Sequence, residues 1–194
     1  MFIWFDQYMI MEALQKIKTK FFHRQLQQAV SAQAFRPKPV AFDKAQSVAI
    51  LFDATDPGQR DEAVRYGQAL QQKGKRVGYL AFIDDKQVYE SLPFPYFNRK
   101  NLDWKEVPSG EEVQNFLSRE WDALFFLTNS APPPLHYVAA LAKSHLKIGP
   151  AGDASPYLDL MIDFPNDRFD IPGFTQQAER LLQKLQMKHE RIFL

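Results

Sequence analysis

Apolar residues in this chain recur in short unbroken runs, separated by segments in which they are spaced as on one face of a helix. The clearest run is VAILF at residues 48–52, followed at once by the acidic turn DATD at 53–56. A strand with one face in solvent alternates apolar and polar residues, whereas a strand covered on both faces of a parallel sheet is apolar throughout. This run therefore predicts a central, fully buried strand.

Further strands and helices follow in alternation. The expected strands are residues 76–82, 123–128, 146–149 and 158–164, with a short strand at 96–98, and the expected helices are 57–73, 109–119, 135–145 and 174–187. Strand, helix and strand in succession form a right-handed parallel crossover. The pattern predicts an α/β fold, a three-layer sandwich with a mostly parallel sheet of about five strands. It is Rossmann-like or flavodoxin-like, and the strand order stays open.

Local signals support several of these boundaries. Asp56, Pro57 and Gln59 are typical of a helix start, with Asp56 as the capping residue. Ser109 is expected to cap the next helix in the same way. The proline-rich stretch between residues 86 and 108 is too irregular for a helix, and we expect a long loop anchored in the core by Phe94, Phe97 and Trp104.

The region before the first strand has a different pattern. Between residues 11 and 34 an apolar stripe of Leu14, Ile17 and Phe21, with Phe22 and Leu26 slightly further round, predicts a basic amphipathic helix. We therefore divide the chain into an N-terminal helical arm, residues 1–40, and a single α/β domain, residues 41–194. The arm is expected to dock on the domain, on a second copy of the chain or on a protein partner. Weak, reversible attachment to an anionic membrane surface is the alternative.

Charge separates the same two parts. Residues 1–40 carry six basic and two acidic groups, whereas the remainder carries 18 basic and 21 acidic groups. The first eleven residues lack a basic leader and are too short for a transmembrane segment. Met9 and Met11 leave open whether residues 1–10 belong to the natural protein. The chain contains no cysteine, which excludes disulfides, thiolate metal sites and a cysteine nucleophile, and fits a cytoplasmic location.

The sequence places polar residues after the expected strands. In a parallel α/β sheet, ligands bind beyond the carboxyl ends of the strands, where the strand order reverses. The candidate ligand-binding residues at that edge are Asp53, Thr55, Asp56, Thr128, Asn129, Ser130, His136 and Gly149. With Asp84 and Asp85, the carboxylates of Asp53 and Asp56 could hold Mg²⁺. We favour structural roles for these acids, in a helix cap and in turns.

No motif assigns a reaction. The chain has no glycine-rich dinucleotide loop, no phosphate-binding lysine loop and no nucleophile elbow, and its histidines lack the spacing of a metal site. His136, near a helix start, is a candidate base. We name no catalytic or metal-binding residue, and the cofactor is unknown. Nucleic-acid binding is not expected, because the basic and aromatic segment at 96–104 lies in an acidic domain.

Five segments resemble a small bacterial family of unknown function: ILFDATD at 50–56, FNRKNLDW at 97–104, WDALFFLT at 121–128, YVAALAKSHLKIG at 137–149 and YLDLMID at 157–163. The resemblance covers about residues 12–190 and implies a fold without an activity. The two segments spanning 121–149 are also similar, more weakly, to the amino-terminal half of the lipopolysaccharide heptosyltransferases. The chain departs from those enzymes in having DATD in place of a glycine-rich loop and in lacking the sugar-nucleotide domain.

These observations lead to one preferred function and two alternatives. We expect a non-catalytic module that binds a ligand or another protein. The first alternative is a small glycosyltransferase-like enzyme that handles a nucleotide or nucleotide sugar, with or without Mg²⁺. The second is a peripheral membrane protein held by its basic N-terminal helix.

Overall fold

The computed structural model describes residues 3–128, 132–152, 155–164 and 169–190. Six parallel strands form its main sheet, in the order β3-β2-β1-β5-β7-β8. Their bounds are β1 Ser47–Asp53, β2 Arg76–Ile83, β3 Tyr96–Asn98, β5 Ala123–Leu127, β7 Lys147–Pro150 and β8 Leu160–Ile162. A separate two-stranded parallel sheet joins β4 (Glu120–Trp121) to β6 (Lys143–Ser144). The parallel α/β fold is confirmed, and the short strand expected at 96–98 is the sixth strand of the sheet.

The strand order identifies the topology. From central β1 the chain moves outward to β2 and β3, and then returns to the other side of β1 for β5, β7 and β8. This is the Rossmann arrangement rather than the flavodoxin one. Since parallel crossovers are right-handed, the two directions of winding place their helices on opposite faces of the sheet.

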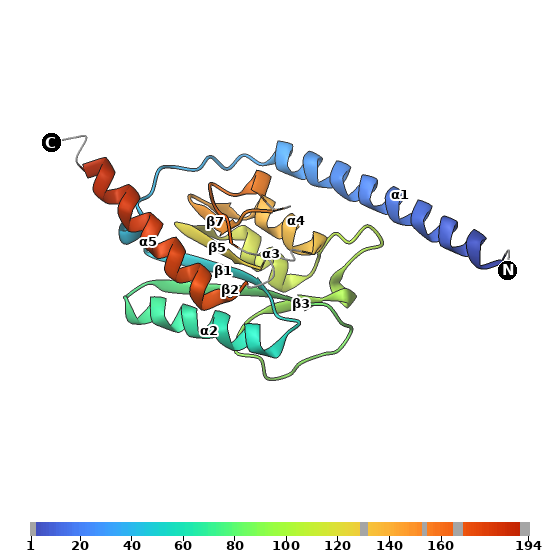
Figure 1. The fold of residues 1–194 in the computed structure, drawn as a ribbon, viewed down its shortest axis with the longest axis horizontal. Coiled ribbons are helices and arrows are strands. Elements are labelled where there is room, and N and C mark those ends of the chain that lie inside the picture. The colour runs from blue at the N-terminus through green and yellow to red at the C-terminus, as the bar shows by residue number, and fades with distance from the viewer. Residues whose placement is uncertain (1–2, 129–131, 153–154, 165–168, 191–194) are drawn as a thin grey trace.

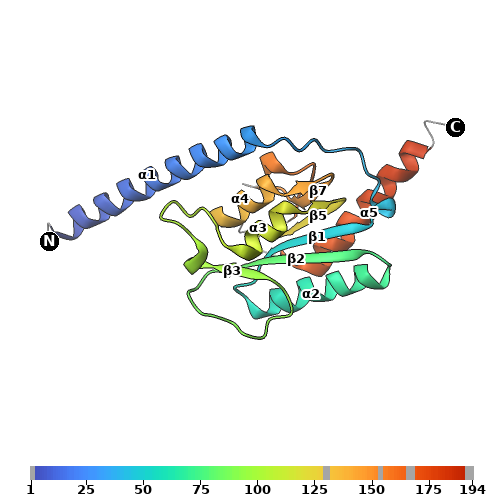
Figure 2. The same cartoon turned by 180° about the vertical axis from the view of Figure 1, so that it is seen from behind.

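Helices cover both faces, as three-layer packing requires (Figure 1, Figure 2). Helix α2 (Pro57–Gln72) and helix α5 (Ile171–Glu190) lie on one face, and α3 (Glu111–Ser118) and α4 (Pro133–Leu141) lie on the other. Three short 3-10 helices complete the described elements: η1 Phe42–Lys44, η2 Arg99–Asn101 and η3 Ser155–Tyr157. No helix among the described residues is both long enough and apolar enough to cross a bilayer.

Strand β1 shows why its sequence is apolar throughout. Val48, Ile50 and Phe52 pack into the core under α2 and α5. Ala49 and Leu51, on the opposite face, belong to the core under α3 and α4. All five are fully buried.

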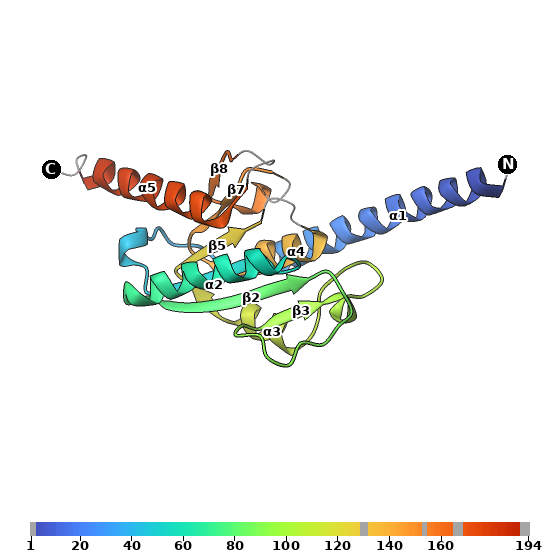
Figure 3. The same ribbon diagram turned by 60° about the horizontal axis from the view of Figure 1, so that its bottom comes forward.

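Helix α1 (Ile3–Ala32) lies outside these layers and packs against α4. It begins eight residues earlier than the apolar spacing predicted, because residues 3–32 contain no glycine or proline to interrupt a helix. Phe22 and Leu26 are buried in a small cluster with Val107 and Ala140. The N-terminal part of α1 extends beyond the rest of the fold (Figure 3).

Three expectations about local structure were wrong. Gly110, not Ser109, caps α3, with a φ of 111° that favours glycine, while the Ser109 hydroxyl donates to the carbonyl of Asn101. Helix α4 ends at Leu141, short of His145, because the next residues pair as strand β6. Trp104 is 62% exposed and does not anchor its loop in the core, although Phe94 and Phe97 do.

Candidate functional site

The carboxyl ends of β1 and β5 meet at the point where the strand order reverses. Phe52 pairs with Leu127 in the parallel register, so Asp53, the last residue of β1, and Thr128, the first residue after β5, lie at the same edge of the sheet. The turn at 53–56 and Thr128 therefore lie at one edge, as predicted. Asn129 and Ser130 lie outside the described residues.

The turn after β1 is held together by its own carboxylates. Asp53 Oδ1 accepts a hydrogen bond from the Thr55 amide at 2.9 Å. Asp56 Oδ1 accepts from the amides of Gly58 and Gln59, at 2.7 and 3.1 Å, and caps α2 as predicted. Pro57 has no amide hydrogen, and the Arg60 amide donates to the Asp56 carbonyl. The amides that would receive a phosphate at this helix start are thus already occupied.

Hydrogen bonds to two other segments fix the same turn. The Arg60 guanidinium donates to the carbonyl of Ala54 and lies 5.2 Å from the centre of the Tyr89 ring. Thr55 Oγ1 accepts from the Asp84 amide at 3.0 Å. Thr55 therefore connects the ends of β1 and β2 and serves a structural role.

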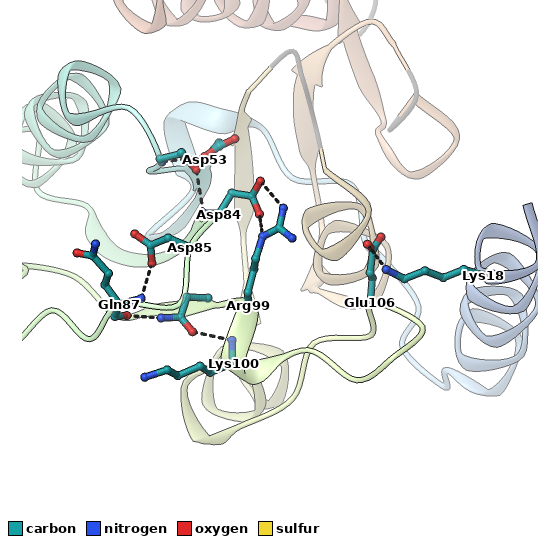
Figure 4. A network of polar contacts seen from close by, with 10 residues as sticks. Lys18, Asp53, Asp84, Asp85, Gln87, Arg99, Lys100 and Glu106 are labelled. Atoms are coloured by element: carbon teal, nitrogen blue, oxygen red, sulfur yellow. Dashed lines mark hydrogen bonds and ion pairs between the residues drawn. The ribbon is translucent and has the colours of Figure 1, made fainter. Parts of the chain in front are cut away.

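The two acids after β2 also have partners in the chain (Figure 4). Asp84 accepts from Arg99 Nε at 2.5 Å and from Arg99 Nη2 at 3.0 Å. Asp85 accepts from the Gln87 amide at 2.9 Å and from the Tyr89 hydroxyl at 2.5 Å, and this second bond raises the pKa of Tyr89. Within the described ranges, no three histidine or acidic side chains are grouped so that they could hold a metal ion. The four carboxylates act mainly as acceptors for protein donors.

The start of α4, beyond β5, offers no free amide either. Pro132 is its N-cap, and Pro133 and Pro134 follow, so these three positions have no amide hydrogen. The amides of Leu135 and His136 both donate to the carbonyl of Pro132, at 2.9 and 3.3 Å. Both helices that begin at the switch point therefore lack the free amides on which Rossmann folds bind phosphate.

Two further candidates occupy packed positions. Thr128 is buried, with 2% of its surface exposed. A Cβ atom on Gly149 would come within 2.8 Å of Leu158 Cδ1 and 3.1 Å of Phe126 Cβ. Close packing between β7 and its neighbours explains this glycine without a ligand.

His136 lines a groove between α1 and α4. The groove has a volume of about 430 Å³, and its lining residues are Lys18, Thr19, Phe22, His23, Glu106, Pro133 and His136. Lys18 Nζ and Glu106 Oε1 form an ion pair of 2.5 Å at its side. The sequence identified His136 alone, because the other polar members come from α1 and from a distant loop.

The stripe on α1 is divided between two environments. Phe22 and Leu26 are buried, but Leu14, Ile17 and Phe21 are 59%, 49% and 44% exposed. Phe21 meets the exposed Trp104 edge-on, with 5.6 Å between ring centroids. We call Leu14, Ile17, Phe21 and Trp104 the exposed apolar face.

Polar contacts hold α1 and its connection in place. Lys105 Nζ donates to Gln25 Oε1 at 2.9 Å, and Gln33 Nε2 donates to the Leu141 carbonyl at 2.8 Å. Phe35, after the helix, stacks on His145 with 5.2 Å between ring centroids. The docking of the arm on the domain is thus present in the structure, while the exposed apolar face points elsewhere.

Comparison with known proteins gives a family and no activity. No curated protein matches the chain. A family model described as "Family of unknown function (DUF6913)" matches residues 18–185, which include the docked part of α1 and all strands of the sheet. The chain belongs to this family of unknown function.

Proposed function

We propose that this protein is a non-catalytic protein-interaction module, and that its docking surface is the exposed apolar face of Leu14, Ile17, Phe21 and Trp104. The observation that carries the proposal is the exposure of these four large side chains side by side, on a helix held to the fold by other residues. Contiguous exposed apolar surface on a folded protein marks interaction sites.

The Rossmann domain supports this proposal because the hydrogen-bonding groups in the described part of its switch point are already bonded within the chain. The amides at the starts of α2 and α4 are bonded within the chain or replaced by proline. The acids Asp53, Asp56, Asp84 and Asp85 accept hydrogen bonds from protein donors. The glycosyltransferase-like alternative therefore gains no support from the described part of this edge, and the body serves as a scaffold.

Anchoring makes α1 a suitable interaction element. Burial of a large apolar side chain contributes roughly 1.5 to 3 kcal/mol, so three helical side chains and a tryptophan provide several kcal/mol of binding energy. An isolated helix of this kind would lose part of that energy on becoming ordered. In this protein Phe22 and Leu26 already order the helix by packing on α4.

The occupant that we propose is a different protein. Between residues 14 and 28, α1 carries four basic residues and no acidic residue. Lys20 and Arg24 flank the apolar positions, and a second copy of α1 would bring its own four cations to the same surface, while its Glu12 is paired with Lys16. Like charges brought together at an interface oppose association.

Site-specific photo-crosslinking tests this function. We would replace Ile17 by p-benzoylphenylalanine in cells that make the protein, with Gln27 as a matched control, since it is exposed on the same helix outside the apolar face. We expect adducts with another protein from position 17 and not from position 27. Adducts only with a second copy would show a homo-oligomer, and adducts only with lipid would show a membrane anchor; either result overturns the proposal.

The groove beside His136 favours a second candidate function, small-molecule binding. Its volume of about 430 Å³ lies in the range of ligand sites, and charged or polar groups from Lys18, His23, Glu106 and His136 converge on it. Thermal-shift screening against nucleotides and nucleotide sugars with Mg²⁺ tests this candidate and the enzyme alternative together. A ligand that raises the melting temperature of the native chain, and not of a His136→Ala variant, would support it.

A further inference from the structure

A hollow lies beside Phe21, at one end of the exposed apolar face. Its volume is about 380 Å³, and it is lined by Phe21, Arg24, Gln25, Gln28 and Lys105. The two charged members, Arg24 and Lys105, are both cations, and among the described residues no acidic one lines the hollow. The exposed apolar face thus adjoins a basic hollow.

Both cations are open to an external acceptor. In the described part of the chain, Lys18 pairs with Glu106 and Lys16 with Glu12, whereas neither Arg24 nor Lys105 forms an ion pair. Arg24 is exposed on α1. The described ion pairs of α1 involve Lys16 and Lys18, so they do not neutralise the positive charge of Arg24 and Lys105 in the hollow.

Lys105 is held in position by its surroundings. Its ammonium donates to Gln25 Oε1 at 2.9 Å and lies 5.4 Å from the centre of the Trp104 ring. The turn that carries it is fixed by Asp103 Oδ1, which accepts from the amides of Lys105 and Val107 at 2.8 and 2.9 Å. Glu106, next in the chain, has a φ of 66°, a left-handed conformation that a residue with a side chain seldom adopts. A cation fixed in this way loses little freedom when it binds an acceptor.

We propose that this hollow is a carboxylate-binding subsite, and that the segment docking on the exposed apolar face is an amphipathic helix with an Asp or Glu beside its apolar stripe. This inference rests on the proposed interaction function and adds the chemistry of the partner. The guanidinium of Arg24 offers the paired donors that match a carboxylate, and Lys105 adds a second charge. The apolar stripe supplies affinity, while the hollow selects orientation and partner.

A second copy of this chain does not fit the same description. The acidic residues of its α1 helix, Asp6 and Glu12, precede the apolar stripe, and Glu12 already pairs with Lys16. A lipid would place its phosphate in the hollow and its acyl chains on the apolar face, and its adducts would contain no peptide segment. The experiment below separates these occupants.

The test uses the full chain with p-benzoylphenylalanine at Gln28, which lines the hollow and leaves both cations in place. We compare it with the probe at Ile17, in the native background and with Arg24→Glu and Lys105→Glu combined. Arg65→Glu with Lys100→Glu gives the same change of net charge on exposed positions away from α1.

We expect the segment captured from position 28 to carry Asp or Glu at the crosslinked turn. The Arg24 and Lys105 reversal should lower capture from both positions by about tenfold or more, as loss of charge-assisted hydrogen bonds implies, and the control reversal should not. If the reversal impairs folding, as judged by the melting temperature, Arg24→Gln with Lys105→Gln should lower capture to a smaller extent.

The outcomes distinguish this inference from the function on which it rests. Capture of a protein from position 17 with unchanged yield in the reversal overturns the carboxylate subsite and leaves the interaction function standing. A captured segment without acidic residues, or a second copy of the chain, also overturns it. Failure to capture any protein from position 17 overturns both.

Discussion

Phe21 of α1 and Trp104 of the loop after β3 meet edge-on, with ring centroids 5.6 Å apart and planes inclined by 64°. Phe21 is 44% exposed and Trp104 62%, so this contact joins the arm to the domain without fully burying either ring. The loop contributes two further contacts to α1, through Glu106 to Lys18 and through Lys105 to Gln25. One short turn thus positions both the helix and the surface that we propose for docking.

A double-mutant cycle of Phe21→Ala and Trp104→Ala measures this contact. Edge-to-face aromatic pairs contribute about 0.5 to 1.5 kcal/mol beyond their buried area, so we expect a coupling energy in that range from urea unfolding. Val88 is 69% exposed, and it serves as the control. A cycle of Phe21→Ala with Val88→Ala should be additive, and equal coupling in both cycles would contradict a specific ring contact.

Replacement of Asp56 by alanine tests whether the first turn is structural. Two amides, of Gly58 and Gln59, would lose their acceptor, and we expect a loss of about 0.5 to 2 kcal/mol in the free energy of unfolding. Asp56→Ser should retain most of the stability, because serine also caps helices. Asp61→Ala, at an exposed position of the same helix, is the control. An Asp56→Ala variant that keeps native stability but loses Mg²⁺ binding would show instead that Asp56 is a metal ligand.

Gly149→Ala separates packing from ligand binding at the end of β7. The added methyl group would lie 2.8 Å from Leu158 Cδ1 and 3.3 Å from the carbonyl oxygen of Phe126, which is backbone and cannot easily move. We expect a destabilisation of about 1 to 3 kcal/mol, typical of overpacking. No atom of the described residues, apart from the chain neighbours of Gly152, lies within 4 Å of a Cβ added there, so Gly152→Ala should be nearly neutral in the same unfolding assay.

The layered fold was predictable because its signals are local. The run at residues 48–52 is apolar at every position since β1 has a core on each face, and Asp56 and Pro57 mark the start of α2 by their own backbone preferences. Strand order was not predictable, because it depends on which buried strand lies beside β1. The apolar runs in the sequence do not indicate which strands are neighbours in the sheet.

The candidate site was predictable only in part, for a related reason. The parallel topology placed Asp53 and Thr128 at the correct edge of the sheet. The donor to Asp84, in contrast, is Arg99, which folding brings from 15 residues further along the chain. The basic hollow joins Arg24 to Lys105 across 80 residues of sequence. The spacing of α1 showed an amphipathic helix and could not show which half of its stripe would be covered.

The pH dependence of stability tests Lys147, a half-buried lysine at the start of β7. Burial lowers the pKa of Lys147 from 10.5 to about 8, and Asp159 opposes part of that shift. Lys147 Nζ donates to the carbonyls of Ala139 and Ala140, near the C-terminal end of α4.

The sign of the effect follows from proton binding. Between about pH 8 and pH 10.5 the unfolded chain keeps the proton on Lys147 and the folded chain has lost it, so stability rises with pH in this window. From about pH 7.5 to about pH 9.5 we expect this group to add about 1 to 2 kcal/mol to the free energy of unfolding. Lys75, whose pKa burial also lowers, contributes with the same sign. The comparison is therefore made between the native chain and Lys147→Met, by urea unfolding at both pH values. The variant should lack the Lys147 increment, and identical pH profiles for the two proteins would show that Lys147 titrates as it does in the unfolded chain.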